Sequence, residues 1–186
     1  NLTHGESVVS LGSCFSVNMG SKLSYYGFAV NNNPFGTLFH PSAIARVIDL
    51  TLNSSQERIC KRDNTHYSYD AHSSIYALSE NELKNTLQRN RNELLVSLKN
   101  ARLCLVTFGS SWGYYLDGEI VANCHKMPSA VFEKKLTQTE VMISEWTMLI
   151  EKIKKINPEI EFIFSVSPVR HLKDGMVENT LSKSRL

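Results

Sequence analysis

The segment Gly12-Ser13-Cys14-Phe15 places a hydroxyl and a thiol side by side, between an apolar run that ends at Leu11 and a stretch that can form a helix. A serine at such a turn lies near the free N–H groups of the first helical turn, which stabilise an oxyanion together with the helix dipole. Gly12 permits a tight turn and leaves room for a substrate. Ser13 is therefore a candidate nucleophile, although a serine here can equally be the N-cap of the helix.

Cys14 offers a second chemistry, because thiolates at helix N-termini have lowered pKa values. We favour Ser13 as the nucleophile and expect Cys14 to be a small buried residue behind the turn, at the wall of the substrate pocket. The spacings of the other cysteines, Cys60, Cys104 and Cys124, match neither a zinc site nor a redox pair. We expect reduced thiols, no metal and no other cofactor.

The composition is typical of a soluble globular protein, with 42% hydrophobic and 20% charged residues. A chain of 186 residues fits one domain with a sizeable core. No apolar run approaches the roughly 20 residues needed to cross a bilayer. The net charge is +2 and the basic residues are dispersed, so we expect neither nucleic acid nor a membrane surface as a partner.

Strands and helices alternate in the predicted order. Apolar runs predict strands at 8–11, 28–30, 102–109 and 161–166, the last of them buried. Amphipathic runs and capping patterns predict helices at 15–26, from Pro41, from the capping box Ser79–Glu82 and from a second box, Thr137–Glu140. Residues 60–78 read as an irregular insertion with a hairpin, and a second hairpin turns at 117–118.

This alternation predicts an α/β fold of three layers, α/β/α, with a parallel sheet and helices on both faces. Ligands bind to such sheets outside the carboxyl ends of the strands. Ser13, Gly36 and the segments 109–112 and 167–171 come just after predicted strands. Asn123 can reach the same edge by way of the hairpin. We therefore expect one site at this edge.

Five segments, in order, resemble the GSCFA-domain family. They are GSCF at 12–15, NNNPFGTLFHP at 31–41, VTFGSSWGY at 106–114, VANCHKMP at 121–128 and SPVRHLKDGMVENTLSKSRL at 167–186. The resemblance covers nearly the whole chain. The family is grouped with the SGNH-type hydrolases, so the resemblance implies a flavodoxin-like fold and ester hydrolysis or acyl transfer, without naming a substrate.

The resemblance also implies roles for single residues. Ser13 would be the nucleophile, and its own N–H would donate to the oxyanion. Gly36 would supply a second N–H, and Asn123 a side-chain donor. Asn123 departs from the usual SGNH pattern, in which the asparagine follows two residues after a glycine, because here serines follow Gly109. Gly109, Trp112 and His72 are the further residues expected to line the substrate pocket.

The general base is the largest departure from the SGNH pattern. SGNH enzymes usually draw an Asp and a His from one D-x-x-H segment after the last strand, which places the base and its orienting carboxylate on one turn. No such segment follows Ser167, and the D-x-x-H at 63–66 lies in the wrong order. We expect a final strand and this segment beyond Leu186, so that the domain is C-terminally incomplete here, or a base from elsewhere in the chain.

Two histidines are candidates for a substitute base. His125 stands beside Asn123, and His171 follows a predicted strand with Asp174 close enough in sequence to orient it. We expect a serine-dependent esterase or acyl-transfer enzyme whose partner is a small acyl ester, such as an acetylated carbohydrate. The alternatives are a non-catalytic binding module that retains the fold and a thiol hydrolase that uses Cys14.

Overall fold

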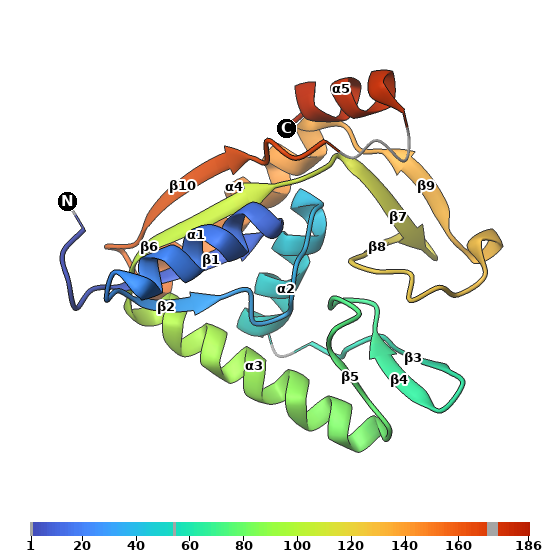
Figure 1. Ribbon diagram of the computed structural model, residues 1–186, viewed down its shortest axis with the longest axis horizontal. Helices are drawn as coiled ribbons and strands as arrows, with labels where there is room; N and C mark the ends of the chain where they lie inside the picture. Colours follow the sequence, from blue (N-terminus) through green and yellow to red (C-terminus); the bar gives the residue numbers. More distant parts are fainter. Residues whose placement is uncertain (1, 54, 171–174) are drawn as a thin grey trace.

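A computed structural model describes residues 2–53, 55–170 and 175–186. A four-stranded sheet and two three-stranded sheets make up its β-structure (Figure 1). The four-stranded sheet has the spatial order β2 (Ala29–Asn32), β1 (Ser7–Gly12), β6 (Ala101–Phe108) and β10 (Glu161–Val166). All three of its pairings are parallel, as the alternation of strands and helices predicts.

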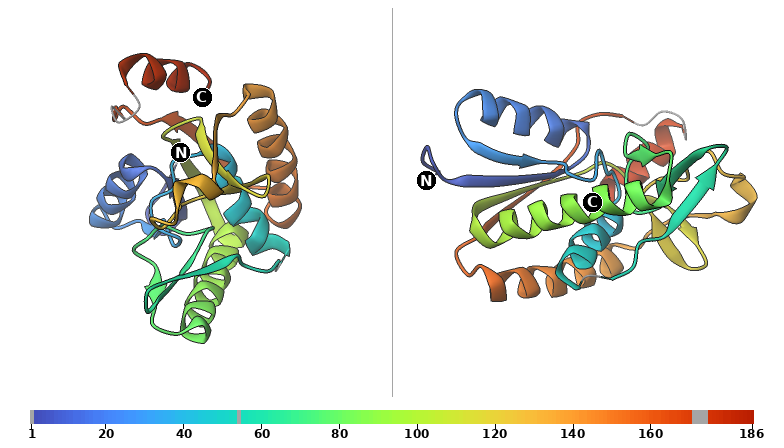
Figure 2. Two further views of the ribbon diagram at one scale, coloured as in Figure 1. Left: turned by 90° about the vertical axis from the view of Figure 1, so that its right-hand side faces the viewer. Right: turned by 90° about the horizontal axis from the view of Figure 1, so that it is seen from below.

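Helices cover both faces of this sheet. Helix α1 (Cys14–Tyr25) lies on one face, and α2 (Pro41–Asn53), α3 (Glu80–Asn100) and α4 (Thr139–Ile156) lie on the other (Figure 2). The main core fills the space between the sheet and these three helices. Its most completely buried side chains include Val9, Ile44, Val47, Ile48, Leu83, Leu87, Leu94, Leu98, Val106, Ile153 and Ile160. The predicted α/β fold with a parallel sheet and two helical layers is confirmed.

Side chains cap two helix starts, and the first of them, at Ser79, is the predicted one. The Ser79 hydroxyl accepts a hydrogen bond of 3.2 Å from the Glu82 N–H at the start of α3. At the start of α2, Nδ1 of His40 accepts a hydrogen bond of 3.1 Å from the Ser42 N–H. Both side chains therefore satisfy donors that the first helical turn leaves free.

The second predicted capping box, at Thr137, is wrong. Helix α4 begins after Gln138, whose side chain makes no capping bond. The Thr137 hydroxyl instead contacts His40 Nε2 at 2.9 Å and the Tyr115 hydroxyl at 2.7 Å. A buried tertiary contact has taken the place of the local cap.

The two smaller sheets are antiparallel and lie beyond the carboxyl ends of the central strands (Figure 1). The predicted insertion forms β3 (Ile59–Arg62), β4 (Thr65–Ser68) and β5 (Tyr76–Ala77), which include the expected hairpin. The hairpin predicted at 117–118 joins β7 (Trp112–Leu116) to β8 (Glu119–Val121). A 3-10 turn at 129–131 then leads to β9, at 133–136, which pairs with β7.

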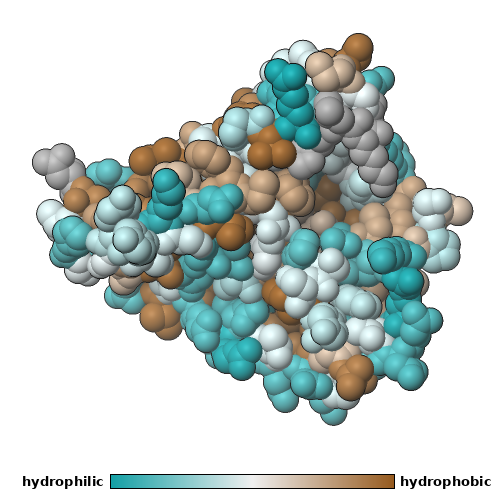
Figure 3. All heavy atoms as spheres, viewed as in Figure 1, coloured by the Kyte–Doolittle hydropathy of each residue, from teal (hydrophilic) through white to brown (hydrophobic). Residues whose placement is uncertain are grey.

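Strand β10 is exposed rather than buried as predicted. Ile163 is 52% exposed, and Phe164 and Val166 are each 42% exposed. The physical reason is position, because β10 is the last strand of its sheet and pairs only with β6 within the described part of the chain. Figure 3 shows hydrophobic residues gathered along the edge of the molecule where β10 runs. The final helix, α5 (Met176–Ser184), follows.

None of the described helices is both long enough and apolar enough to cross a membrane. No disulfide joins any of the four cysteines, all of which the structure describes. Across residues 2–53, 55–170 and 175–186, no three His, Cys, Asp or Glu side chains cluster as metal ligands would.

Candidate functional site at the carboxyl edge

The turn between β1 and α1 is fixed by its neighbours. Gly12 has a φ of +124°, and a Cβ at this position would overlap the carbonyl oxygen of Thr107 on β6. The Gly12 N–H donates to Oδ1 of Asn33 at 2.7 Å, and the Ser13 N–H donates to the Thr107 carbonyl at 3.0 Å. Only glycine fits the turn, which holds Ser13 between β6 and the loop after β2.

Ser13 is the N-cap of α1. Its hydroxyl accepts a hydrogen bond of 3.3 Å from the Phe15 N–H, and the residue has 0% exposure. Cys14 is the first residue of the helix and is only half-buried, not buried as predicted. The capping role of Ser13 is confirmed, its role as nucleophile stays a prediction, and the Cys14 residue is the more accessible of the two.

The segments that follow the central strands meet at this edge, as the rule for parallel sheets predicts. The Leu38 N–H donates to the Gly12 carbonyl at 2.9 Å, and the Gly109 N–H donates to the Phe39 carbonyl at 2.7 Å. The Ser167 N–H donates to the last carbonyl of β6 at 2.7 Å. The loops after β2, β6 and β10 therefore meet at the sheet edge that carries the Gly12–Ser13 turn, and the loop after β2 contacts the turn itself.

Helix α5 is anchored to the same edge. Lys183 Nζ donates to the carbonyls of Gly109 and Ser167, at 2.6 and 2.8 Å. The Ser182 hydroxyl accepts a hydrogen bond of 2.8 Å from the N–H of residue 111. Burial lowers the pKa of Lys183, and its attraction to the nearby Cys14 opposes that shift. Lys183 thus joins the ends of β6 and β10 and places an amino group near the predicted nucleophiles.

Two of the residues predicted to bind substrate lie under α5. The Trp112 indole N–H donates to the Glu178 carbonyl at 3.3 Å, and the Lys134 ammonium lies 4.9 Å from the centre of the Trp112 ring. Gly109 is packed so closely that a Cβ would lie 2.7 Å from the ring of Phe39. Both residues are at the predicted edge.

Gly36 and His72 are brought together from distant parts of the chain. Gly36 has a φ of +75°, and a Cβ there would lie 2.5 Å from the Cβ of His72. The Gly36 N–H donates to the Asn33 carbonyl at 2.8 Å. Because the Ser13 N–H also has a carbonyl partner, both backbone donors assigned to the oxyanion are engaged in this structure. Neither is open to a substrate without local movement.

Asn123 and His125 form a separate cluster. Oδ1 of Asn123 accepts a hydrogen bond of 2.8 Å from the His125 N–H, which is an Asx turn. His125 is 3% exposed, its Nε2 lies 2.7 Å from the Ser68 carbonyl, and its ring stacks on Tyr67 at 4.7 Å. Neither residue makes a hydrogen bond to Ser13 among the contacts described. The roles of both as oxyanion donor and base stay predictions.

Burial lowers the pKa of His125, the nearby His72 lowers it further, and the Ser68 carbonyl opposes both effects. Nδ1 of His125 is buried without a hydrogen-bond partner. The ring therefore belongs to the packing of β4 against the hairpin. His171, the other predicted base, and Asp174 lie outside the residues that the structure describes.

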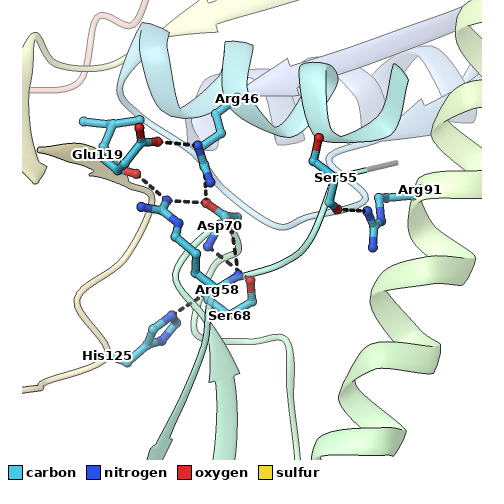
Figure 4. A network of polar contacts seen from close by, with 9 residues as sticks. Arg46, Ser55, Arg58, Ser68, Asp70, Arg91, Glu119 and His125 are labelled. Atoms are coloured by element: carbon cyan, nitrogen blue, oxygen red, sulfur yellow. Dashed lines mark hydrogen bonds and ion pairs between the residues drawn. The ribbon is translucent and has the colours of Figure 1, made fainter. Parts of the chain in front are cut away.

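An ion-pair network that the sequence did not reveal holds the insertion in place (Figure 4). Asp70 is 3% exposed and accepts hydrogen bonds from Arg46 at 2.7 Å and Arg58 at 2.5 Å. Arg46 also pairs with Glu119 at 2.6 Å. The network joins α2, the insertion and β8. His72 itself is tied to the loop after β2 by its N–H, which donates to the Phe35 carbonyl at 2.9 Å.

His40 is a second residue whose role the sequence did not reveal, and it does more than cap α2. It is 5% exposed, and its Nε2 lies 3.2 Å from the Ser111 carbonyl and 2.9 Å from the Thr137 hydroxyl. Burial lowers the pKa of His40 to about 4, and its hydrogen bond to Ser111 opposes the shift. The neutral ring ties the loop after β2 to the segments that precede β7 and α4.

Comparison with known proteins agrees with the motifs at this edge. Residues 7–186 match the sequence model of the GSCFA family. No curated protein and no solved structure matches the chain. Since the family match spans almost all of the sequence, the chain belongs to the GSCFA family.

Proposed function

We propose that this chain is an SGNH-type, serine-dependent enzyme that hydrolyses a small acyl ester or transfers its acyl group. The observation that carries the proposal is the position of Ser13. It lies at the carboxyl edge of a parallel sheet and at the N-terminus of a twelve-residue helix, on a turn that only glycine permits. Loops from three other strands meet at the same edge, where ligands bind to parallel sheets.

In this proposal Ser13 Oγ attacks the carbonyl carbon of the ester, and its proton passes to a base. The C–O bond to the leaving alcohol then breaks, the alcohol takes that proton, and water or a second alcohol releases the acyl group from Ser13. The N–H groups at the start of α1 favour the negative charge that develops on the carbonyl oxygen. His171, with Asp174 to orient it, is the base we propose, because His125 is committed to Ser68.

The buried state of Ser13 adds a requirement. Its hydroxyl caps α1, and its own N–H and that of Gly36 already have carbonyl partners. Substrate binding must therefore open this edge and release at least one of these donors. We expect the segments that contact the turn, rather than the central sheet, to move.

The test is hydrolysis of 4-nitrophenyl acetate by the chain and by Ser13→Ala. We expect kcat/KM to fall at least about a thousandfold, because the covalent step is lost. Ser21→Ala, an exposed serine on the same helix, is the matched control and should keep full activity. Loss of the cap costs only about 1 kcal/mol, so circular dichroism should show a folded variant. Equal activity in Ser13→Ala would contradict the proposal.

A specific observation also favours a second candidate, a thiol-dependent hydrolase. Cys14 is partly exposed at a helix N-terminus, near Lys183, whereas Ser13 is enclosed. This candidate predicts that Cys14→Ala abolishes the hydrolysis and that Ser13→Ala retains it. A third result, no saturable hydrolysis by the unmodified chain, would favour a binding module that has kept the fold without the chemistry.

A further inference from the structure

A cavity lies away from the Ser13 edge, on the side of the sheet that carries α2 and α4. It has a volume of about 350 Å³ and is walled by α2, α4 and the β7–β8 hairpin. Each helix contributes one face, from Ser42 to Asp49 on α2 and from Glu145 to Lys152 on α4. Its volume is within the range of pockets that hold small molecules, ~300–1,000 Å³.

The inner wall of this cavity carries polar atoms without partners. Ser42 is 3% exposed, and its hydroxyl oxygen and Oε2 of Glu145 are both buried without a hydrogen-bond partner. A ligand in the cavity reaches these atoms when the Ser42 or Glu145 side chain turns toward it. Burial raises the pKa of Glu145, and the nearby Ser42 hydroxyl offsets part of that shift without reaching hydrogen-bond geometry. Buried acceptors without donors are costly, so this wall favours a group that donates several hydrogen bonds.

The charges around the cavity indicate which charge the hydrogen-bonding group of a ligand should carry. Arg46 pairs with Glu119 at 2.6 Å, which Figure 4 shows, and Lys152 pairs with Asp49 at 2.7 Å. Glu145 has no ion-pair partner among the described residues. The uncompensated charge of the ionised lining is therefore negative, and it lies beside the Ser42 hydroxyl.

The cavity thus favours a positive charge and several hydrogen-bond donors. A primary ammonium group has both, because it is a cation with three N–H donors. A calcium ion does not, since it takes six to eight oxygen ligands and this wall offers far fewer. The remaining lining is mixed. Ala45, Ile120 and Leu149 supply apolar surface, and the two ion pairs at the rim offer donors and acceptors for hydroxyl groups.

We propose that this cavity binds a small hydroxylated amine of the size of an amino sugar, with its ammonium group on Glu145 and Ser42 and its hydroxyl groups at the rim. The proposal does not depend on the chemistry of Ser13. A ligand of about a dozen heavy atoms that makes one ion pair in an open cavity should bind with a dissociation constant on the order of 1 mM.

The test is an NMR titration of the ¹⁵N-labelled chain with glucosamine at pH 7. We expect saturable shifts in the amide signals of 42–49 and 145–152. Glucose and N-acetylglucosamine, which lack the ammonium group, should bind at least about tenfold more weakly. Hexylamine keeps the ammonium group without the hydroxyl groups and should also bind more weakly than glucosamine.

Glu145→Gln removes the charge and keeps the shape of the side chain, and it should weaken glucosamine binding at least about tenfold. Glu151→Gln, an exposed glutamate on the same helix, is the matched control and should bind as the unmodified chain does. The same spectra show whether each variant is folded. The proposal is wrong if glucosamine gives no saturable shifts or if folded Glu145→Gln retains full affinity for it. It is also wrong if glucose or hexylamine binds as tightly as glucosamine does.

Discussion

His40 should make the protein sensitive to acid through a single buried ring. Nδ1 accepts the Ser42 N–H, and Nε2 faces the Ser111 carbonyl and the Thr137 hydroxyl. These contacts fit the neutral ring with its proton on Nε2. A second proton, on Nδ1, would point at the hydrogen of the Ser42 N–H and repel it. Protonation must therefore break the hydrogen bond that caps α2, and it also places a charge in a buried site.

The size of the effect follows from the two pKa values of His40. The ordinary pKa is 6.5, and burial lowers it to about 4 in the folded chain. Above pH 6.5 neither state binds the proton. Below it the unfolded chain does, so stability falls as the pH falls and levels off below about 4. The loss should be about 1.4 kcal/mol at pH 5.5 and about 2.5 kcal/mol at pH 4.5.

Urea unfolding at pH 7.5, 6.5, 5.5 and 4.5 measures this loss, with His40→Asn as the reference. Asparagine can still accept the Ser42 N–H as an N-cap, but it does not titrate. Other groups titrate in both proteins and cancel in the difference. The unmodified chain should therefore lose about 2.5 kcal/mol more than His40→Asn between pH 7.5 and 4.5.

Parallel pH curves for the two proteins would refute this reasoning. They would mean that His40 is protonated in the folded chain near its ordinary pKa, so that the ring is not held neutral by its contacts. A steeper loss in His40→Asn than in the unmodified chain would contradict it as well.

Three further substitutions test the contacts that build the site. Asp70→Ala should lower the free energy of unfolding in urea by about 3 kcal/mol, because it leaves two guanidinium groups without their buried carboxylate; a loss below about 0.5 kcal/mol would show that the network is dispensable. Gly12→Ala should cost at least about 3 kcal/mol, through its φ and the overlap with Thr107. Gly118→Ala, also at positive φ but with open space around it, should cost clearly less in the same thermal-unfolding measurement. Lys183→Met should speed amide hydrogen exchange in α5 and leave the central sheet protected, since two charge-assisted hydrogen bonds are lost; unchanged exchange would contradict an anchoring role.

Local patterns predicted the elements well because their causes lie within a few residues. The Ser79 hydroxyl reaches a donor three residues away, and the turn at Asp117 needs only the backbone freedom of the residues beside it. Apolar runs located the four central strands. Thr137 shows the limit, because its hydroxyl found a buried partner 97 residues away in His40 instead of capping α4.

The burial of a strand was harder to predict than its existence. The apolar run at 161–166 indicated a strand covered on both faces, but β10 is an edge strand with Ile163 and Phe164 exposed. An apolar run of this length favours a strand. The order of strands in a sheet depends on contacts between distant segments. The apolar run therefore does not tell whether its strand lies at the centre of the sheet or at its edge.

The candidate site was predicted in part. The carboxyl ends of parallel strands lie at one edge of the sheet, and this depends only on strand direction. The sequence therefore predicted that Ser13, Gly109 and Ser167 lie at the same edge. It could not place Asn123, since the position of the hairpin depends on remote contacts such as that between His125 and the Ser68 carbonyl. The pairing of Asp70 with arginines 24 and 12 residues away left no recognisable spacing in the sequence.

The nucleophile is tested most directly by covalent labelling. The chain is treated with a fluorophosphonate probe, which reacts with activated serines, and the adduct is located by peptide mapping. The account predicts an adduct on Ser13 that disappears in Ser13→Ala and persists in Cys14→Ala and Ser21→Ala. No adduct on Ser13, while iodoacetamide modifies Cys14 and stops ester hydrolysis, would contradict the account and establish the thiol as the reacting group.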